Sequence, residues 1–124
     1  MKLLKVDKLL IFWTIFVLLV IVLPFSPDSA VSQIMGEVDY SDKIAHFILF
    51  GIFAWLLNDS LQSRNIKNFS AYVLSFLGTS VYAGLAELIQ SYIPSRDMSL
   101  SDFLAGTIGA IVALSVIYVR DKRK

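Results

Sequence analysis

Four apolar segments, separated by charged or Gly/Pro/Ser-containing stretches, dominate this chain of 124 residues. The segments at 9–25, 69–93 and 100–119 are each near the roughly 20 residues that a helix needs to cross about 30 Å of hydrocarbon. The segment at 44–57 is shorter, and by length alone it could lie in a membrane interface. Because 56% of the residues are hydrophobic and only 17% are charged, we predict an all-α membrane protein.

The basic residues decide how many segments cross the membrane. With four spans, nine lysines and arginines fall on one side and only Lys43 and Arg96 fall on the other. Lys/Arg bias in short loops sets orientation, with the basic side cytoplasmic. Three spans would put the two ends of the chain on opposite sides and remove this asymmetry. We therefore predict a four-transmembrane-helix bundle with both termini cytoplasmic, in the cytoplasmic membrane.

Nothing in the sequence divides the chain into separate units. It contains no repeat, no low-complexity run and no long linker, so we predict a single membrane domain over residues 1–124. The predicted spans are approximately 9–25, 42–59, 69–93 and 101–119. The first segment follows a basic start, as in a signal peptide, but Asp28 stands where the only plausible cleavage site needs a small residue. We expect this first span to be uncleaved.

Four polar residues lie in the apolar segments at comparable depth. His46 is near the start of the second, Glu87 and Gln90 are near the end of the third, and Asp102 starts the fourth. Strict alternation of direction places all four at the same, outer membrane face. Ionisable groups are expensive in lipid, about 2.5–3.5 kcal/mol at the bilayer centre on insertion scales. We therefore expect them to meet each other or a ligand.

Three neighbouring charged residues extend this candidate site. Asp42 precedes His46 by one helical turn and can share its face. Lys43 and Arg96 are the two external basic residues, and an arginine can bind phosphate or carboxylate bidentately. We predict a ligand-binding site that comprises Asp42, Lys43, His46, Glu87, Gln90, Arg96 and Asp102. If the site catalyses a reaction, His46, Glu87 and Asp102 are the candidate catalytic residues.

Each of these residues also has a purely structural reading. Glu87 could be a packing carboxylate, and His46 could tie two helices through one hydrogen bond. Asp102 could merely cap its helix with Ser99, in a Ser-x-x-Asp pattern. Helix packing in lipid depends on small residues. We expect the small residues of the third segment to face Gly106 and Gly109 of the fourth.

Several functional classes have no support in the sequence. The chain has no cysteine and one histidine, so a zinc site is disfavoured and we predict no metal and no cofactor. It contains no P-loop, no G-x-G-x-x-G, no H-E-x-x-H and no G-x-S-x-G. The basic residues form membrane anchors rather than a nucleic-acid-binding patch.

An ordered set of motifs resembles the VanZ-like family, which is associated with teicoplanin resistance. The matching residues are Asp42-Lys43-x-x-His46-Phe47, Glu87-x-x-Gln90, Arg96 and Asp102-x-x-x-Gly106-x-x-Gly109. Gly106 stands where the family usually has asparagine. The resemblance implies a four-span membrane unit with a role in envelope physiology or glycopeptide tolerance.

The residues themselves leave three functions open. The site could bind an anionic lipid headgroup, a lipid-linked amphiphile or a glycopeptide amphiphile from the outer leaflet. It could instead belong to a lipid-phosphate or polyprenyl-phosphate hydrolase that uses His46 and Glu87. The chain could also be a structural subunit of a membrane complex. In all three readings its partners include membrane lipids.

Labelling of single cysteines tests the predicted topology, because the natural chain has none. An impermeant thiol reagent applied to intact cells should label cysteines placed at Met35 and Ser95. A cysteine at Asn68 should react only after the membrane is permeabilised. Labelling of this position in intact cells would end the four-span arrangement.

Overall fold

The computed structural model describes residues 4–22, 40–66, 68–92 and 100–123, and helices make up nearly all of them. No strand occurs in these four stretches, which confirms the all-helical class. The helices are α1 (Lys5–Val22), α3 (Tyr40–Ser63), α4 (Asn68–Gln90) and α5 (Leu100–Lys122).

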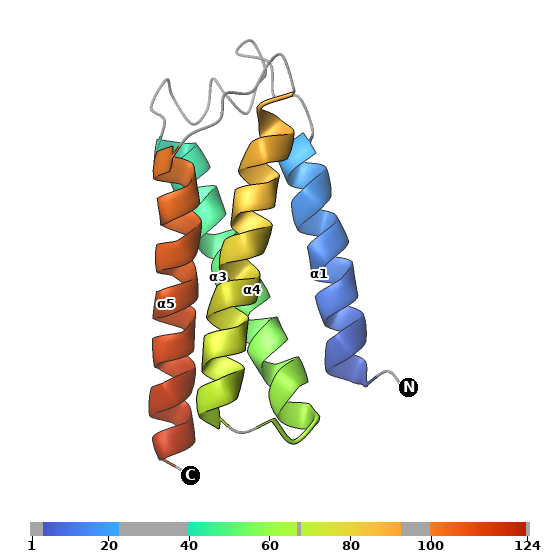
Figure 1. Cartoon of the computed structure of the whole chain (residues 1–124), viewed down its shortest axis with the longest axis vertical. Coiled ribbons are helices and arrows are strands. Elements are labelled where there is room, and N and C mark those ends of the chain that lie inside the picture. The colour runs from blue at the N-terminus through green and yellow to red at the C-terminus, as the bar shows by residue number, and fades with distance from the viewer. Residues whose placement is uncertain (1–3, 23–39, 67, 93–99, 124) are drawn as a thin grey trace.

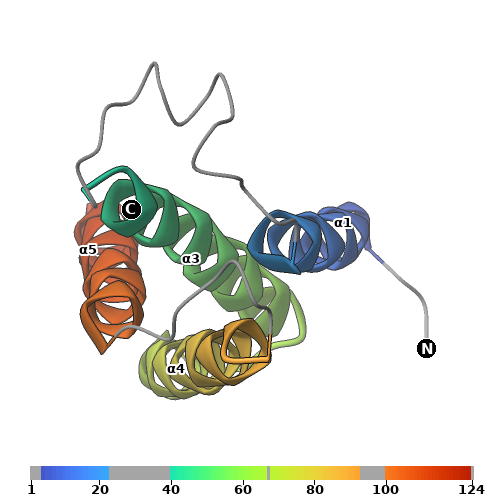
Figure 2. The same ribbon diagram turned by 90° about the horizontal axis from the view of Figure 1, so that it is seen from above.

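The helices run alternately up and down, side by side (Figure 1). The start of α1 and the end of α5 therefore lie at the same end of the bundle, which we call the terminal end. The start of α3, the end of α4 and the start of α5 lie at the opposite end. Seen from above, α3 is central, with α5, α4 and α1 around it (Figure 2). Helix α3 contacts all three other helices, whereas α1 contacts α3 and α4 at the edge of the bundle.

Three helices are long and apolar enough to cross a membrane, namely Lys43–Ser63, Phe69–Gln90 and Leu100–Lys122. Helix α1 has 18 residues and begins Lys-Val-Asp-Lys, so three charges stand within its length. The predicted first span continues to residue 25, beyond the described part of this helix. The crossing by α1 therefore remains a prediction, as does the cytoplasmic position of the termini.

The outer surface of the bundle carries large apolar side chains on every helix. Phe12 and Leu19 on α1, Ile48 on α3 and Val81 on α4 are all exposed, and α5 continues the pattern. A soluble monomer rarely exposes continuous apolar surface on this scale. The buried residues, by contrast, include many polar groups. A bundle with apolar side chains outside and polar groups inside is suited to lipid, where unpaired polar groups are costly.

The closest helix contact joins α3 to α5 through glycine backbones. A Cβ atom added to Gly109 would overlap the carbonyl group of Phe47, and one added to Gly51 would lie 3.1 Å from the Gly109 oxygen. At Gly106 an added Cβ would lie 2.9 Å from the Phe50 ring. Small residues permit such close approach between helices in lipid.

The expected partner of these α5 glycines was therefore wrong. Gly106 and Gly109 face Phe50 and Phe47 of α3, not the small residues of α4. On α4, Gly84 approaches α5 only at Phe103, and an added Cβ there would be at an ordinary 3.7 Å. Small residues indicated that α5 packs closely, but spacing along one helix does not identify the helix that it faces.

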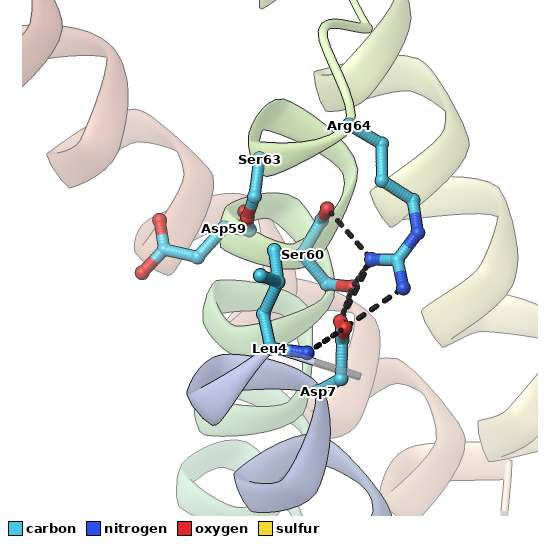
Figure 3. A network of polar contacts seen from close by, with 6 residues as sticks. All are labelled: Leu4, Asp7, Asp59, Ser60, Ser63 and Arg64. Atoms are coloured by element: carbon cyan, nitrogen blue, oxygen red, sulfur yellow. Dashed lines mark hydrogen bonds and ion pairs between the residues drawn. The ribbon is translucent and has the colours of Figure 1, made fainter. Parts of the chain in front are cut away.

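An ion-paired network fastens α1 to α3 at the terminal end (Figure 3). The guanidinium of Arg64 donates to both carboxylate oxygens of Asp7, at 2.8 and 2.7 Å. Ser60 Oγ donates to Asp7 at 2.5 Å, and the Leu4 amide donates at 2.8 Å. This carboxylate therefore also caps the first turn of α1. Arg64 reaches it from the end of α3, where Asn65 has a left-handed φ of 65°.

The chain turn at Asn65 is a Schellman motif. The Ile66 amide donates to the Leu61 carbonyl at 3.3 Å, and the Asn65 amide donates to Gln62 at 3.0 Å. These two bonds satisfy carbonyls that the end of a helix otherwise leaves unpaired, and asparagine tolerates the left-handed conformation. The turn ends α3 at Ser63, just before Arg64, whose guanidinium folds back onto Asp7.

Other polar contacts complete the attachment of the helices. Trp13 Nε1 of α1 donates to the Leu49 carbonyl of α3 at 2.9 Å, and Tyr82 of α4 donates to the Thr14 carbonyl of α1 at 2.6 Å. At the terminal end, Asp121 of α5 accepts from Tyr72 at 2.8 Å. These contacts hold helices in register where lipid gives no hydrophobic force between them.

Substitution of Gly109 tests the α3–α5 contact. Gly109→Ala should destabilise the bundle by roughly 1–3 kcal/mol or prevent its folding, because the new methyl group meets backbone that cannot rotate away. Gly84→Ala is the matched control, since its Cβ has ordinary space. Thermal unfolding in detergent measures both variants. Equal stability of the two would contradict the close contact.

Loss of the Asp7 carboxylate tests the terminal network. Hydrogen bonds from Arg64, then Ser60 and the Leu4 amide, lower the pKa of Asp7 well below its usual range. A group with a lowered folded pKa stabilises the protein above its unfolded pKa, near 4, and loses this contribution as the pH falls further. We expect Asp7→Asn to lower the melting temperature at pH 7.

The melting temperature of Asp7→Asn should fall less in acid than that of the natural protein. From about pH 5 to pH 3, the difference between the two melting temperatures should begin to shrink, since the unfolded state gains the proton first. Melting curves across this range measure the difference, and the other carboxylates cancel because both proteins contain them. A constant difference at every pH would exclude a contribution from Asp7 ionisation.

Candidate functional site

Three buried ionisable residues from three helices meet at the end of the bundle opposite the terminal end. His46 lies in the second turn of α3, Glu87 in the last turn of α4 and Asp102 in the first turn of α5. Their exposed fractions are 4%, 2% and 7%. The alternating direction of the helices brings these positions together although they lie far apart in the sequence.

The three side chains converge on one small region inside the bundle. His46 Nε2 lies 3.2 Å from Glu87 Oε1. One ligand atom from each of His46, Glu87 and Asp102 lies within 4.8 Å of the others. Lys43 Nζ is 4.0 Å from Asp102 Oδ1, and its side chain is 33% exposed. The site therefore has a buried imidazole and two carboxylates, with an ammonium group at its rim.

An aromatic layer closes the site toward the middle of the bundle. The fully buried Phe50 lies one helical turn after His46, and their ring centroids are 5.8 Å apart. Tyr82 meets the same phenyl ring edge-on at 5.5 Å. Ala83 and Ala86 of α4 pack in one cluster with Phe50, while Ala54 and Ala110 belong to the next core cluster, farther from the site. This apolar floor keeps the polar groups at one end.

Gly106 has a specific role in this arrangement. It leaves the space that the Phe50 ring occupies, since even a Cβ atom would lie 2.9 Å from that ring. An asparagine at this position, as expected from the VanZ-like pattern, would collide with Phe50.

Gln90 adds a fourth polar side chain near Glu87. It follows Glu87 by three residues, so the two share a face of α4, and it is only 1% exposed. Among the described residues, its Oε1 has no hydrogen-bond partner. A buried carbonyl oxygen without a donor is costly and marks a place where a ligand atom would be stabilised.

Two of the predicted site residues lie partly or wholly outside the described structure. Asp42 lies within α3, but its side chain is outside what the structure describes. Arg96 lies outside the described residues altogether, as does the proposed helix cap Ser99. The structure thus brings together His46, Glu87, Asp102 and Lys43, and buries Gln90 beside Glu87.

Sequence reasoning missed Phe50 and Tyr82. Phe50 carried one usable signal, because it follows His46 by four residues and therefore continues the same helical face. Tyr82 precedes Glu87 by five residues and carried no comparable signal. Its place beside the site depends on how α4 packs, which spacing alone does not give.

Comparison with known families identifies the chain. The sequence model described as VanZ/LLP1 matches residues 8–120. Comparisons with curated proteins and with solved structures gave no match. The match includes all of α3 and α4, most of α1 and α5, and every predicted site residue, including those beyond the described part of the structure. This chain belongs to the VanZ/LLP1 family.

Proposed function

We propose that this protein binds the headgroup of an anionic amphiphile at the outer face of the cytoplasmic membrane. The observation that carries the proposal is the buried contact between His46 and Glu87, with Asp102 beside it, in a bundle whose outer surface is apolar. Ionisable groups inside a membrane bundle are by default functional, because their burial is expensive.

The distribution of basic residues supports an outward-facing site. Among the described residues, Lys5 and Lys8 of α1, Arg64 after α3 and Arg120 to Arg123 at the end of α5 all lie at the terminal end. Lys43 is the one described basic residue at the site end. By the positive-inside rule the terminal end is cytoplasmic, so the site opens toward the outer leaflet.

The rim of the site suits the polar head of an amphiphile. Lys43 is partly exposed at the mouth and paired only loosely with Asp102, so its ammonium group can turn to an incoming phosphate or carboxylate. Arg96, which lies outside the described residues, is a second predicted anion contact. The apolar exterior of α3, α4 and α5 would accompany the hydrocarbon part of the ligand in the bilayer.

Membership of the family suggests the physiological setting. The resemblance implies a role in envelope physiology or glycopeptide tolerance, and an outer-leaflet amphiphile is a chemically suitable ligand for such a role. Deletion of the gene should then change the susceptibility of the host cell to teicoplanin. Restoration by the natural chain, but not by site variants, would link this phenotype to the site.

Lipid retention tests the binding proposal. Native protein purified in mild detergent should carry an anionic amphiphile that mass spectrometry identifies. In His46→Asn, occupancy should fall about tenfold or more, since hydrogen bonds to charged groups contribute roughly 1.5–3 kcal/mol. Occupancy should also fall in Glu87→Gln, because the Glu87 carboxylate positions the His46 imidazole. Asp59→Asn, which changes a carboxylate at the terminal end, is the control and should retain the ligand.

The competing readings predict different results in the same preparation. If His46 and Glu87 only tie helices together, each variant should lose stability by about 0.6 kcal/mol and keep its lipid. If the chain is a hydrolase, the natural protein should release inorganic phosphate from a polyprenyl phosphate, and Glu87→Gln should not. Undiminished lipid in well-folded Glu87→Gln and His46→Asn proteins would exclude the binding proposal.

A further inference from the structure

The triad of His46, Glu87 and Asp102 has the composition of a metal site with open positions. It offers one imidazole nitrogen and two carboxylate oxygens, all buried. Catalytic zinc sites commonly have three protein ligands from these types and leave the fourth position for water or a ligand. One histidine and no cysteine in the sequence disfavour a metal site. The convergence of the three side chains in the fold favours one.

The distances fit a first-row divalent cation after small side-chain movements. Bonds to such ions are about 2.0–2.2 Å for nitrogen and oxygen, so two ligands of a tetrahedral ion lie roughly 3.5 Å apart. His46 Nε2 and Glu87 Oε1, at 3.2 Å, are already close to this separation. One ligand atom from each of the three residues lies within 4.8 Å of the others, so a side-chain rotation brings the third ligand into range.

Gln90 gives an independent indication of a ligand at this position. Its Oε1 is buried and has no donor among the described residues. Because Gln90 lies one turn beyond Glu87 on the same face of α4, its carbonyl oxygen can supply a further neutral ligand. Carbonyl oxygens of glutamine are suitable ligands for hard and borderline divalent cations.

The charges explain why a cation would help the proposed ligand to bind. Two carboxylates that lie close together repel an anionic headgroup. A divalent cation balances both carboxylates and presents a positive centre to the headgroup. It also displaces Lys43 from Asp102, where the two groups are 4.0 Å apart, and so makes the ammonium group available to the same anion.

We propose that His46, Glu87 and Asp102 bind one divalent transition-metal cation, with the Gln90 carbonyl as an additional ligand. The mixed imidazole and carboxylate set suits Zn²⁺ or Mn²⁺, and the tighter binding should be to Zn²⁺. The bridging of this cation to an anionic headgroup rests on the function proposed above. The cation site itself depends only on the four side chains.

The amount of Zn²⁺ that the purified protein binds tests the proposal directly. The protein is purified in detergent with a tag that lacks histidine, stripped with a chelator and titrated with Zn²⁺ alone against a chromophoric competitor. We expect one Zn²⁺ per chain. Glu87→Gln and Asp102→Asn should each weaken Zn²⁺ binding by at least roughly tenfold, since even groups outside the ligand set contribute about 10–100-fold. Asp59→Asn, the control carboxylate, should bind as the natural protein does.

A second variant strengthens binding rather than weakening it. Lys43→Met removes the ammonium group that competes for Asp102, so its affinity for Zn²⁺ should rise several-fold. This variant and Asp102→Asn keep the test decisive if Glu87→Gln does not fold. Zinc should also raise the melting temperature of the natural protein, since it binds the folded state, and should not raise that of Asp102→Asn. Equal zinc content in the natural protein and a Glu87→Gln/Asp102→Asn double variant would overturn the proposal.

The two proposals fail in different ways. If the stripped protein binds no zinc but its amphiphile still depends on His46 and Glu87, the metal proposal is wrong and the binding function stands. If zinc binds with these dependences but no amphiphile is retained with or without it, the metal site stands and the function proposed above is wrong.

Discussion

Backbone contact between α3 and α5 is the constraint on which the site depends. Gly109 lies against the carbonyl group of Phe47, and Gly51 approaches Gly109 from the other helix. His46 is the neighbour of Phe47, while Asp102 lies two turns before Gly109 on the same face of α5. A separation of these helices by even one methyl group would therefore move the His46 imidazole away from the Asp102 carboxylate. In lipid, apolar contact between helices gives no advantage over contact with the lipid, so the close fit of the two backbones is what keeps His46 near Asp102.

The polar groups of the bundle are divided between its two ends. At the terminal end, Asp7 and Arg64 form a bidentate ion pair that is complete within the chain. At the other end, Gln90 keeps a buried oxygen without a donor among the described residues. Between them lies an apolar layer around Phe50. A satisfied network stabilises, whereas a partly satisfied one is costly unless something else binds there. Asn58 Nδ2 and Ser75 Oγ, which lie nearer the terminal end, are also buried without a partner in the described part of the chain. The site end is distinguished because the Gln90 oxygen lies one helical turn from the buried Glu87 carboxylate.

Sequence reasoning predicted what depends on helical rise and direction alone. Four apolar segments in alternation were enough to predict helices and to place His46, Glu87 and Asp102 at one end. The facing of the helices did not follow, because Gly109 packs against a backbone carbonyl that no pattern reveals. The pairing of Asp7 with Arg64 was also missed, since it depends on the left-handed turn at Asn65. Asp42 and Arg96 remain predictions, because their side chains are outside the described part of the chain.

Helix direction also shows which member of the triad most needs a positive partner. Asp102 lies in the first turn of α5, where the positive end of the helix dipole stabilises a carboxylate. Glu87 lies in the last turn of α4, where the negative end of the helix dipole opposes a carboxylate charge. This turn contains no basic residue that would compensate it. Lys43 lies near Asp102, the carboxylate that needs it less. His46 contacts Glu87 directly at 3.2 Å, and a cation shared by both would compensate the carboxylate further. By helix direction alone, Glu87 is therefore the carboxylate that gains more from a bound cation.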